Sequence, residues 1–204
     1  MNRSRDEAWQ LLTEFVASPS LRRHCLAVET AMRAYAVTSD ASPNDWGIVG
    51  LLHDFDYERH PGADLHPQAG ADILRERGYP EWVIRAILSH ADYLDVPRES
   101  PVERTLYAVD ELTGFISAVA LVRPSRAVAD VTAVAVRKKM KDKRFAQGVS
   151  REDLVRGAAE LGVDFDTHVT FVVEAMAANA DLLGLSGRGQ AVKSIRLISV
   201  EWSS

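Results

Sequence analysis

The sequence predicts an all-α fold built as a single-domain helical bundle, and three observations support this expectation. Apolar residues recur with helical periodicity along almost the whole chain, and no segment alternates apolar and polar residues as a strand would. Serine–proline pairs stand where helices would begin, because serine caps a helix and proline fits its first turn. The 204 residues are 47% hydrophobic, which is enough for one substantial core, and no long linker divides them.

The start and stop signals predict each helix in turn. A capping box at 100–103 predicts the start of one helix, and Gly78 predicts a left-handed end for another. The domain is expected to cover residues 1–184, followed by a C-terminal tail, 185–204, whose order the sequence leaves open. The expected helices cover residues 6–16, 21–37, 43–52, 66–78, 80–90, 100–122 and 126–143, a segment after the cap at 150–153, and a long last helix from 164–166 to about 183.

Composition excludes some classes of partner. The net charge of −5 argues against bulk nucleic acid, whose phosphates require an excess of lysine and arginine. The single cysteine, Cys25, cannot form an internal disulfide. Residues 1–7 lack the apolar stretch of a signal peptide, and the apolar run 115–122 is too short to span a membrane. We therefore expect a cytoplasmic protein that does not associate with membranes.

A histidine–aspartate pair, His53-Asp54, comes directly after the apolar stretch 48–52. It lies where a buried helix ends and a polar loop begins, so both side chains can point into a cleft while the core holds the helix. Asp110, expected in mid-helix beside apolar residues, is costly to bury unless a cation compensates its charge. A divalent metal would do so, and imidazole with carboxylate suits Fe, Mn, Co, Ni or Zn.

Other histidines accompany this pair. His24 falls on the apolar stripe of its helix, His66 begins a helix, and His90 ends one. Taken alone, each has an ordinary explanation: a core histidine, a helix cap, and a cation that interacts with the helix dipole. His60 and His168 are interpreted as surface or capping residues.

In combination these residues resemble the HD superfamily of metal-dependent phosphohydrolases, in its bacterial and archaeal HDIG-type branch of uncharacterised predicted hydrolases. The family order is His, then His-Asp, then Asp, on separate helices of an all-α fold. His24, His53-Asp54 and Asp110 match this order, although Phe55-Asp56 replaces the Ile-Gly of the HDIG signature. The resemblance covers roughly residues 20–184 and includes the segments 107–114 and 136–143.

The resemblance implies one or two divalent transition-metal ions. His24, His53, Asp54 and Asp110 would hold the first ion. In two-metal members Asp54 would bridge both ions, and His66 and His90 match the first two of the extra histidines. Ala91 stands where such members often have a third histidine, so Asp92 or water would have to take that place.

The implied reaction is hydrolysis of a phosphate ester in a small nucleotide or related phosphorylated metabolite, by attack of metal-bound hydroxide on phosphorus. Asp54 would act in catalysis as the bridging ligand. With one metal, Asp56, Glu58 or Glu111 could position the water, and the sequence does not rank them. Two alternatives are a non-catalytic sensor that binds metal and nucleotide, and a di-iron oxygenase of the same fold, against which Ala91 counts.

A phosphate ester also requires cations. The basic run 137–144 offers Lys138 and Lys139, and Arg23 lies beside His24. The simpler interpretation of the run is a solvated helix face. The apolar stretch 115–122 fits a homodimer interface as well as a core.

Overall fold

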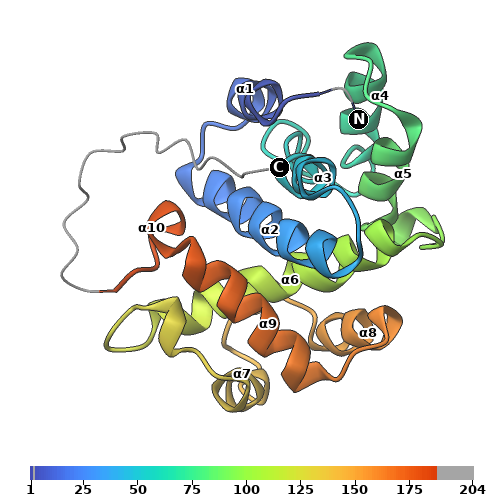
Figure 1. The fold of residues 1–204 in the computed structure, drawn as a ribbon. Helices are drawn as coiled ribbons and strands as arrows, with labels where there is room; N and C mark the ends of the chain where they lie inside the picture. The colour runs from blue at the N-terminus through green and yellow to red at the C-terminus, as the bar shows by residue number, and fades with distance from the viewer. Residues whose placement is uncertain (2, 188–204) are drawn as a thin grey trace.

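The computed structural model describes residues 1 and 3–187, and the described part contains helices and no strands (Figure 1). The predicted all-α fold is confirmed. A single isolated bridge, between Ala127 and Ser186, is the extended pairing found among these residues. The helices are α1 (Arg5–Phe15), α2 (Pro19–Thr38), α3 (Pro43–Leu52), α4 (Gln68–Glu76), α5 (Glu81–Ser89), η1 (Asp92–Leu94), α6 (Pro101–Leu121), η2 (Val128–Asp130), α7 (Ala133–Met140), α8 (Arg151–Leu161), α9 (Phe165–Ala178) and α10 (Ala180–Leu183).

The expected continuous helix over 126–143 was wrong. Arg126 has a left-handed backbone with φ of 55°, and Val131 is extended, so the short η2 is separated from α7. The side chain of Thr132 then caps α7 by accepting the amide hydrogen of Ala135. The expected last helix is also divided, because Asn179 leaves helical geometry between α9 and α10.

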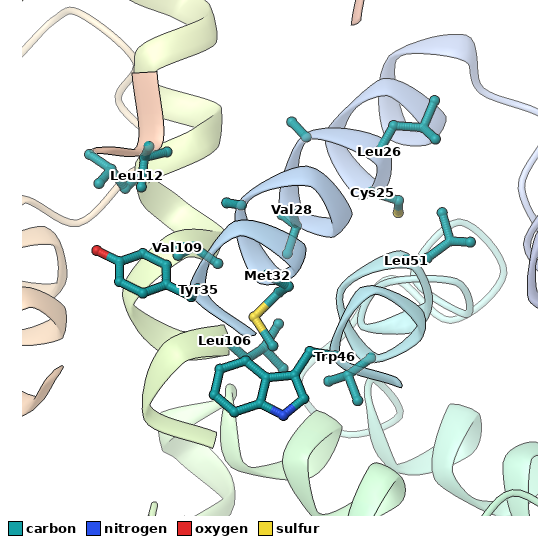
Figure 2. Packing of buried hydrophobic residues seen from close by; sticks show 14 of the residues in the cluster. Cys25, Leu26, Val28, Met32, Tyr35, Trp46, Leu51, Leu106, Val109 and Leu112 are labelled. Carbon is teal, nitrogen blue, oxygen red and sulfur yellow. The ribbon is translucent and has the colours of Figure 1, made fainter. Parts of the chain in front are cut away.

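The core lies mainly where α2 packs against α3 and α6 (Figures 1 and 2). Figure 2 shows Met32 of α2 in one cluster with Trp46 of α3 and Leu106 of α6. Gly50 permits the approach of α3 to α2, because a Cβ there would lie 3.0 Å from the Glu29 backbone. Candidate metal ligands lie on α2 and α6 and directly after α3, so this packing fixes the ligands relative to one another.

The predicted tail falls mostly outside the described residues, which end at 187. Its first residue, Leu185, is buried, and its carbonyl accepts the Val128 amide hydrogen at 2.9 Å. In the apolar stretch 115–122, Phe115 is buried and Val122 is exposed. None of the described helices combines the length and the hydropathy needed to cross a membrane.

Candidate metal centre

Side chains from five segments of the chain meet in one cluster. They come from α2, from the end of α3, from the residue before Pro67, from the end of α5 and from the middle of α6. These segments bring together all six residues that the sequence analysis proposed as ligands: His24, His53, Asp54, His66, His90 and Asp110. Their role as metal ligands remains a prediction.

The first half of the cluster contains His24, His53 and the two aspartates. The Nε2 atoms of His24 and His53 are 3.2 Å apart. Asp110 Oδ1 lies 3.0 Å from the first of these nitrogens and 3.2 Å from the second. Asp54 Oδ2 lies 3.7 Å from His24 Nε2 and 3.5 Å from His53 Nε2. Two nitrogens and two carboxylates thus surround one point, as they would around a shared cation.

The second half shares Asp54 with the first. Asp54 Oδ1 lies 3.2 Å from His66 Nε2 and 3.6 Å from His90 Nε2. The two oxygens of Asp54 therefore face different pairs of histidines. This is the arrangement expected of a carboxylate that bridges two ions.

Hydrogen bonds at Nδ1 determine which nitrogen of three histidines faces the cluster. His53 Nδ1 donates to the Gly50 carbonyl at 2.8 Å, and His90 Nδ1 donates to the Ile87 carbonyl. His66 Nδ1 donates to Asp56 Oδ1 at 2.8 Å. In a neutral imidazole a protonated Nδ1 leaves a lone pair on Nε2, which is the atom a metal requires.

The charges of the cluster also fit a divalent cation. Burial would raise the pKa of Asp54 and of Asp110, yet the neighbouring histidines hold both pKa values below the usual range. Burial opposes protonation of His53, but the two carboxylates raise its pKa to about 10. Two partly buried carboxylates beside the same histidine thus favour nearby positive charge. A divalent ion would supply it and leave the histidines neutral.

Asp56, one of the residues expected to position a water, contacts His66 and Gly70 instead. Its side chain is fully buried, one oxygen accepts from His66, and the other accepts the Gly70 amide hydrogen at 2.9 Å. A Cβ at Gly70 would lie 2.8 Å from Asp56 Cγ, so glycine permits this contact. Both oxygens are occupied, and Asp56 orients His66 rather than a water.

Glu58 and Glu111, the other two candidates for positioning a water, lie in different places. Glu58 Oε2 accepts the Ser18 amide hydrogen at 2.9 Å, which places Glu58 at the start of α2 instead of at the cluster. Glu111 is half-buried, and in the described part of the chain no hydrogen bond or ion pair involves its carboxylate. Burial, followed by the charge of Asp110, raises the pKa of Glu111 to about 7. Of the three candidates, Glu111 is the one that lies beside the cluster with a carboxylate that forms no hydrogen bond or ion pair in the described part of the chain.

Asp92 does not occupy the position of the missing third histidine. Its carboxylate accepts from Arg98 Nη1 at 2.8 Å and also pairs with Arg156. Ala91 is buried beside it. The second half of the cluster therefore consists of Asp54, His66 and His90, without a replacement ligand from Asp92.

His168 was wrongly interpreted as a surface or capping residue. It is fully buried on α9, where Nδ1 accepts from the Tyr35 hydroxyl at 2.6 Å and Nε2 donates to the Ala108 carbonyl at 3.0 Å. It thereby links α9 to α2 and to α6. Its place on the apolar stripe with Val169 and Val172 could have indicated burial.

The proposed phosphate-binding cations are not at the cluster. Lys138 is exposed, and Lys139 Nζ lies 4.6 Å from the centre of the Phe145 ring. Among the described residues no hydrogen bond or ion pair joins either lysine to the cluster. Figure 1 shows α7 on the opposite side of the molecule from α4 and α5. Arg23 is exposed, and its Cδ would lie 3.6 Å from a Cβ at Gly184, so its stem extends toward the end of α10.

Comparison with known proteins gives one match. A family model described as HD domain matches residues 21–114, a range that contains all six residues of the cluster. No curated protein and no solved structure matches the chain. Residues 21–114 therefore form an HD domain, a helical domain typical of metal-dependent phosphohydrolases.

Proposed function

We propose that this protein is a metal-dependent phosphohydrolase of the HDIG-type branch that cleaves a phosphate ester in a small nucleotide or related metabolite. One observation carries the proposal: three histidines are fixed through Nδ1 so that each Nε2 faces the shared carboxylate of Asp54 or its neighbour Asp110. Histidines that bind a metal almost always donate their other ring N–H to a carboxylate or backbone carbonyl in this way.

The ligand set supports a choice among divalent transition-metal ions. His24, His53, Asp54 and Asp110 would hold one ion, and Asp54, His66 and His90 a second. Mixed imidazole and carboxylate ligands suit Fe, Mn, Co, Ni or Zn. A bound divalent ion supplies water that deprotonates near neutral pH, and it neutralises charge on a phosphoryl oxygen.

The residues of the chain have separate tasks in this scheme. Asp54 belongs to both halves of the cluster, because Oδ2 faces His24 and Oδ1 faces His66. Asp56 holds His66 in orientation. Glu111, whose carboxylate has no hydrogen bond among the described residues, would orient the attacking water or exchange a proton with the leaving oxygen.

Hydrolysis by protein loaded in turn with each of the five metals tests the proposal. It is followed as phosphate release from a panel of phosphomonoesters and as formation of the cleaved monoester from a panel of phosphodiesters. We expect turnover of at least one substrate, lost in His53→Gln and retained in His60→Gln, a matched control outside the cluster. Metal binding without turnover of any substrate would favour the sensor. Oxygen uptake by the iron-loaded protein without phosphate release would favour the oxygenase.

A further inference from the structure

Three large exposed side chains contact or directly precede His66 at the edge of the metal cluster. Tyr57 is 47% exposed, Leu65 is 51% exposed and Tyr93 is 52% exposed. They come from two separate segments, the 54–65 loop and η1. Large apolar side chains that gather on a surface mark a binding site more often than isolated ones do.

Contacts with His66 place Tyr57 and Tyr93 at the same residue. The Tyr57 ring lies edge-on to the His66 ring, with the centroids 5.2 Å apart. The Tyr93 hydroxyl donates to the His66 carbonyl at 2.7 Å, and Leu65 precedes His66 in the chain. We call Tyr57, Leu65 and Tyr93 the aromatic shelf.

The shelf lies one side chain away from the bridging carboxylate. The same His66 that contacts Tyr57 and Tyr93 has its Nε2 3.2 Å from Asp54 Oδ1. A ligand whose phosphate lies at the cluster could therefore extend over His66 onto the shelf. Because its hydroxyl is bonded to the backbone, Tyr93 presents its ring with little conformational freedom to lose on binding.

We propose that the aromatic shelf receives a flat aromatic ring of the substrate, which makes the substrate a nucleotide rather than an aliphatic phosphate. This inference rests on the proposed phosphohydrolase function for the position of the phosphate. Tyrosine faces stack on nucleobases with little dependence on base identity, so the shelf selects the class of substrate and not one base. Tyr57 and Tyr93 are thus specificity-determining residues, and the chemistry remains with the cluster.

The test compares a nucleoside monophosphate with glycerol phosphate in steady-state kinetics. We expect the nucleotide to have the higher kcat/KM. Tyr57→Ala should raise its KM about tenfold, as loss of one stacking contact does, while kcat/KM for glycerol phosphate changes less than about twofold. Tyr57→Phe should retain the nucleotide KM, and Trp82→Ala removes an exposed aromatic side chain outside the shelf as a matched control.

A second measurement does not depend on turnover. Calorimetric titration with a phosphate-free nucleoside should show binding to the wild type that is weakened in Tyr57→Ala and retained in Trp82→Ala. Equal kcat/KM for both phosphates, or nucleoside binding unaffected by Tyr57→Ala, would overturn the inference. If the protein hydrolyses nothing, the proposed function fails, and the nucleoside titration still decides whether the shelf binds an aromatic ring.

Discussion

Asp56 and His66 are joined by a hydrogen bond of 2.8 Å between Oδ1 and Nδ1, and this bond turns His66 Nε2 toward Asp54. Partners that orient a histidine in this way raise its basicity and fix its tautomer. The bond also depends on a close approach, since Gly70 gives room to the Asp56 carboxylate. The second half of the cluster is therefore held by a residue that would touch no metal.

Asp56→Ala should weaken metal binding in the second half of the cluster. Loss of such an orienting carboxylate typically lowers metal affinity about 10–100-fold. Binding in the first half, around His24 and His53, should change much less. Metal titration followed by calorimetry measures both affinities. Asp72→Ala is the matched control, because Asp72 is an exposed aspartate of α4 paired with Arg75. Unchanged affinity in Asp56→Ala would show that His66 needs no such support.

Glu111→Gln should lower kcat with little change in KM. The substitution keeps the size of the side chain and removes the carboxylate, and such groups typically contribute about 100-fold or more to the rate. Steady-state kinetics on whichever substrate the panel yields, at constant metal content, measures the effect. Glu174→Gln, at an exposed position of α9, should behave as the wild type. A general acid or base contributes far more than about twofold to the rate. A kcat within about twofold of the wild type would therefore exclude Glu111 from the mechanism.

Gly157→Ala should destabilise the fold. A Cβ at Gly157 of α8 would lie 2.7 Å from the Ala108 Cα of α6, and the obstructing atom is backbone. Overpacking of this kind typically costs about 1–3 kcal/mol, of which better helix propensity returns up to about 1 kcal/mol. Denaturant unfolding measures the difference. Gly148→Ala, where an added Cβ meets nothing within 4 Å, is the matched control. Equal stability of the two variants would mean that α8 shifts without cost.

His168 should make the protein less stable as the pH falls. Burial lowers the pKa of His168, although its hydrogen bond to the Ala108 carbonyl opposes the shift. An unfolded histidine has a pKa of about 6.5. Above that pH both states are neutral at this position and the full stability is present. Below it the unfolded chain takes up a proton that the folded chain resists, so stability falls.

Unfolding midpoints between pH 7.5 and 5 for the wild type and His168→Gln measure this contribution. Glutamine can still donate to the Ala108 carbonyl but does not titrate. Tyr35 should not contribute, because burial raises its pKa to about 12. The wild type should lose more stability than the variant over this range, and parallel curves would contradict the assignment.

The cluster could be predicted from the sequence because its residues occupy helix ends and apolar stripes, positions that local periodicity reveals. His53-Asp54 follows a buried helix, and His24 shares the buried face of α2. What each polar residue contacts could not be predicted. Asp56 stands two residues after Asp54, and only the path of the 54–65 loop turns it toward His66 instead of toward a water.

Contacts between residues far apart in the chain also could not be predicted from the sequence. The hydroxyl that donates to His168 Nδ1 lies 133 positions away in the chain, on Tyr35, and periodicity does not identify such a pair. The exposed aromatic shelf likewise depends on η1 folding back over the residue before Pro67. The break after Arg126 arises from a left-handed backbone at a residue type that rarely adopts it.

Elemental analysis of protein purified without chelator tests the central claim most directly, with Asp54→Ala and His90→Ala beside the wild type. We expect one or two ions of Fe, Mn, Co, Ni or Zn per wild-type chain. Asp54→Ala should lose metal from both halves of the cluster, whereas His90→Ala should keep the ion around His24 and His53. Absence of metal from the wild type, even after reconstitution with each of the five ions, would contradict the account.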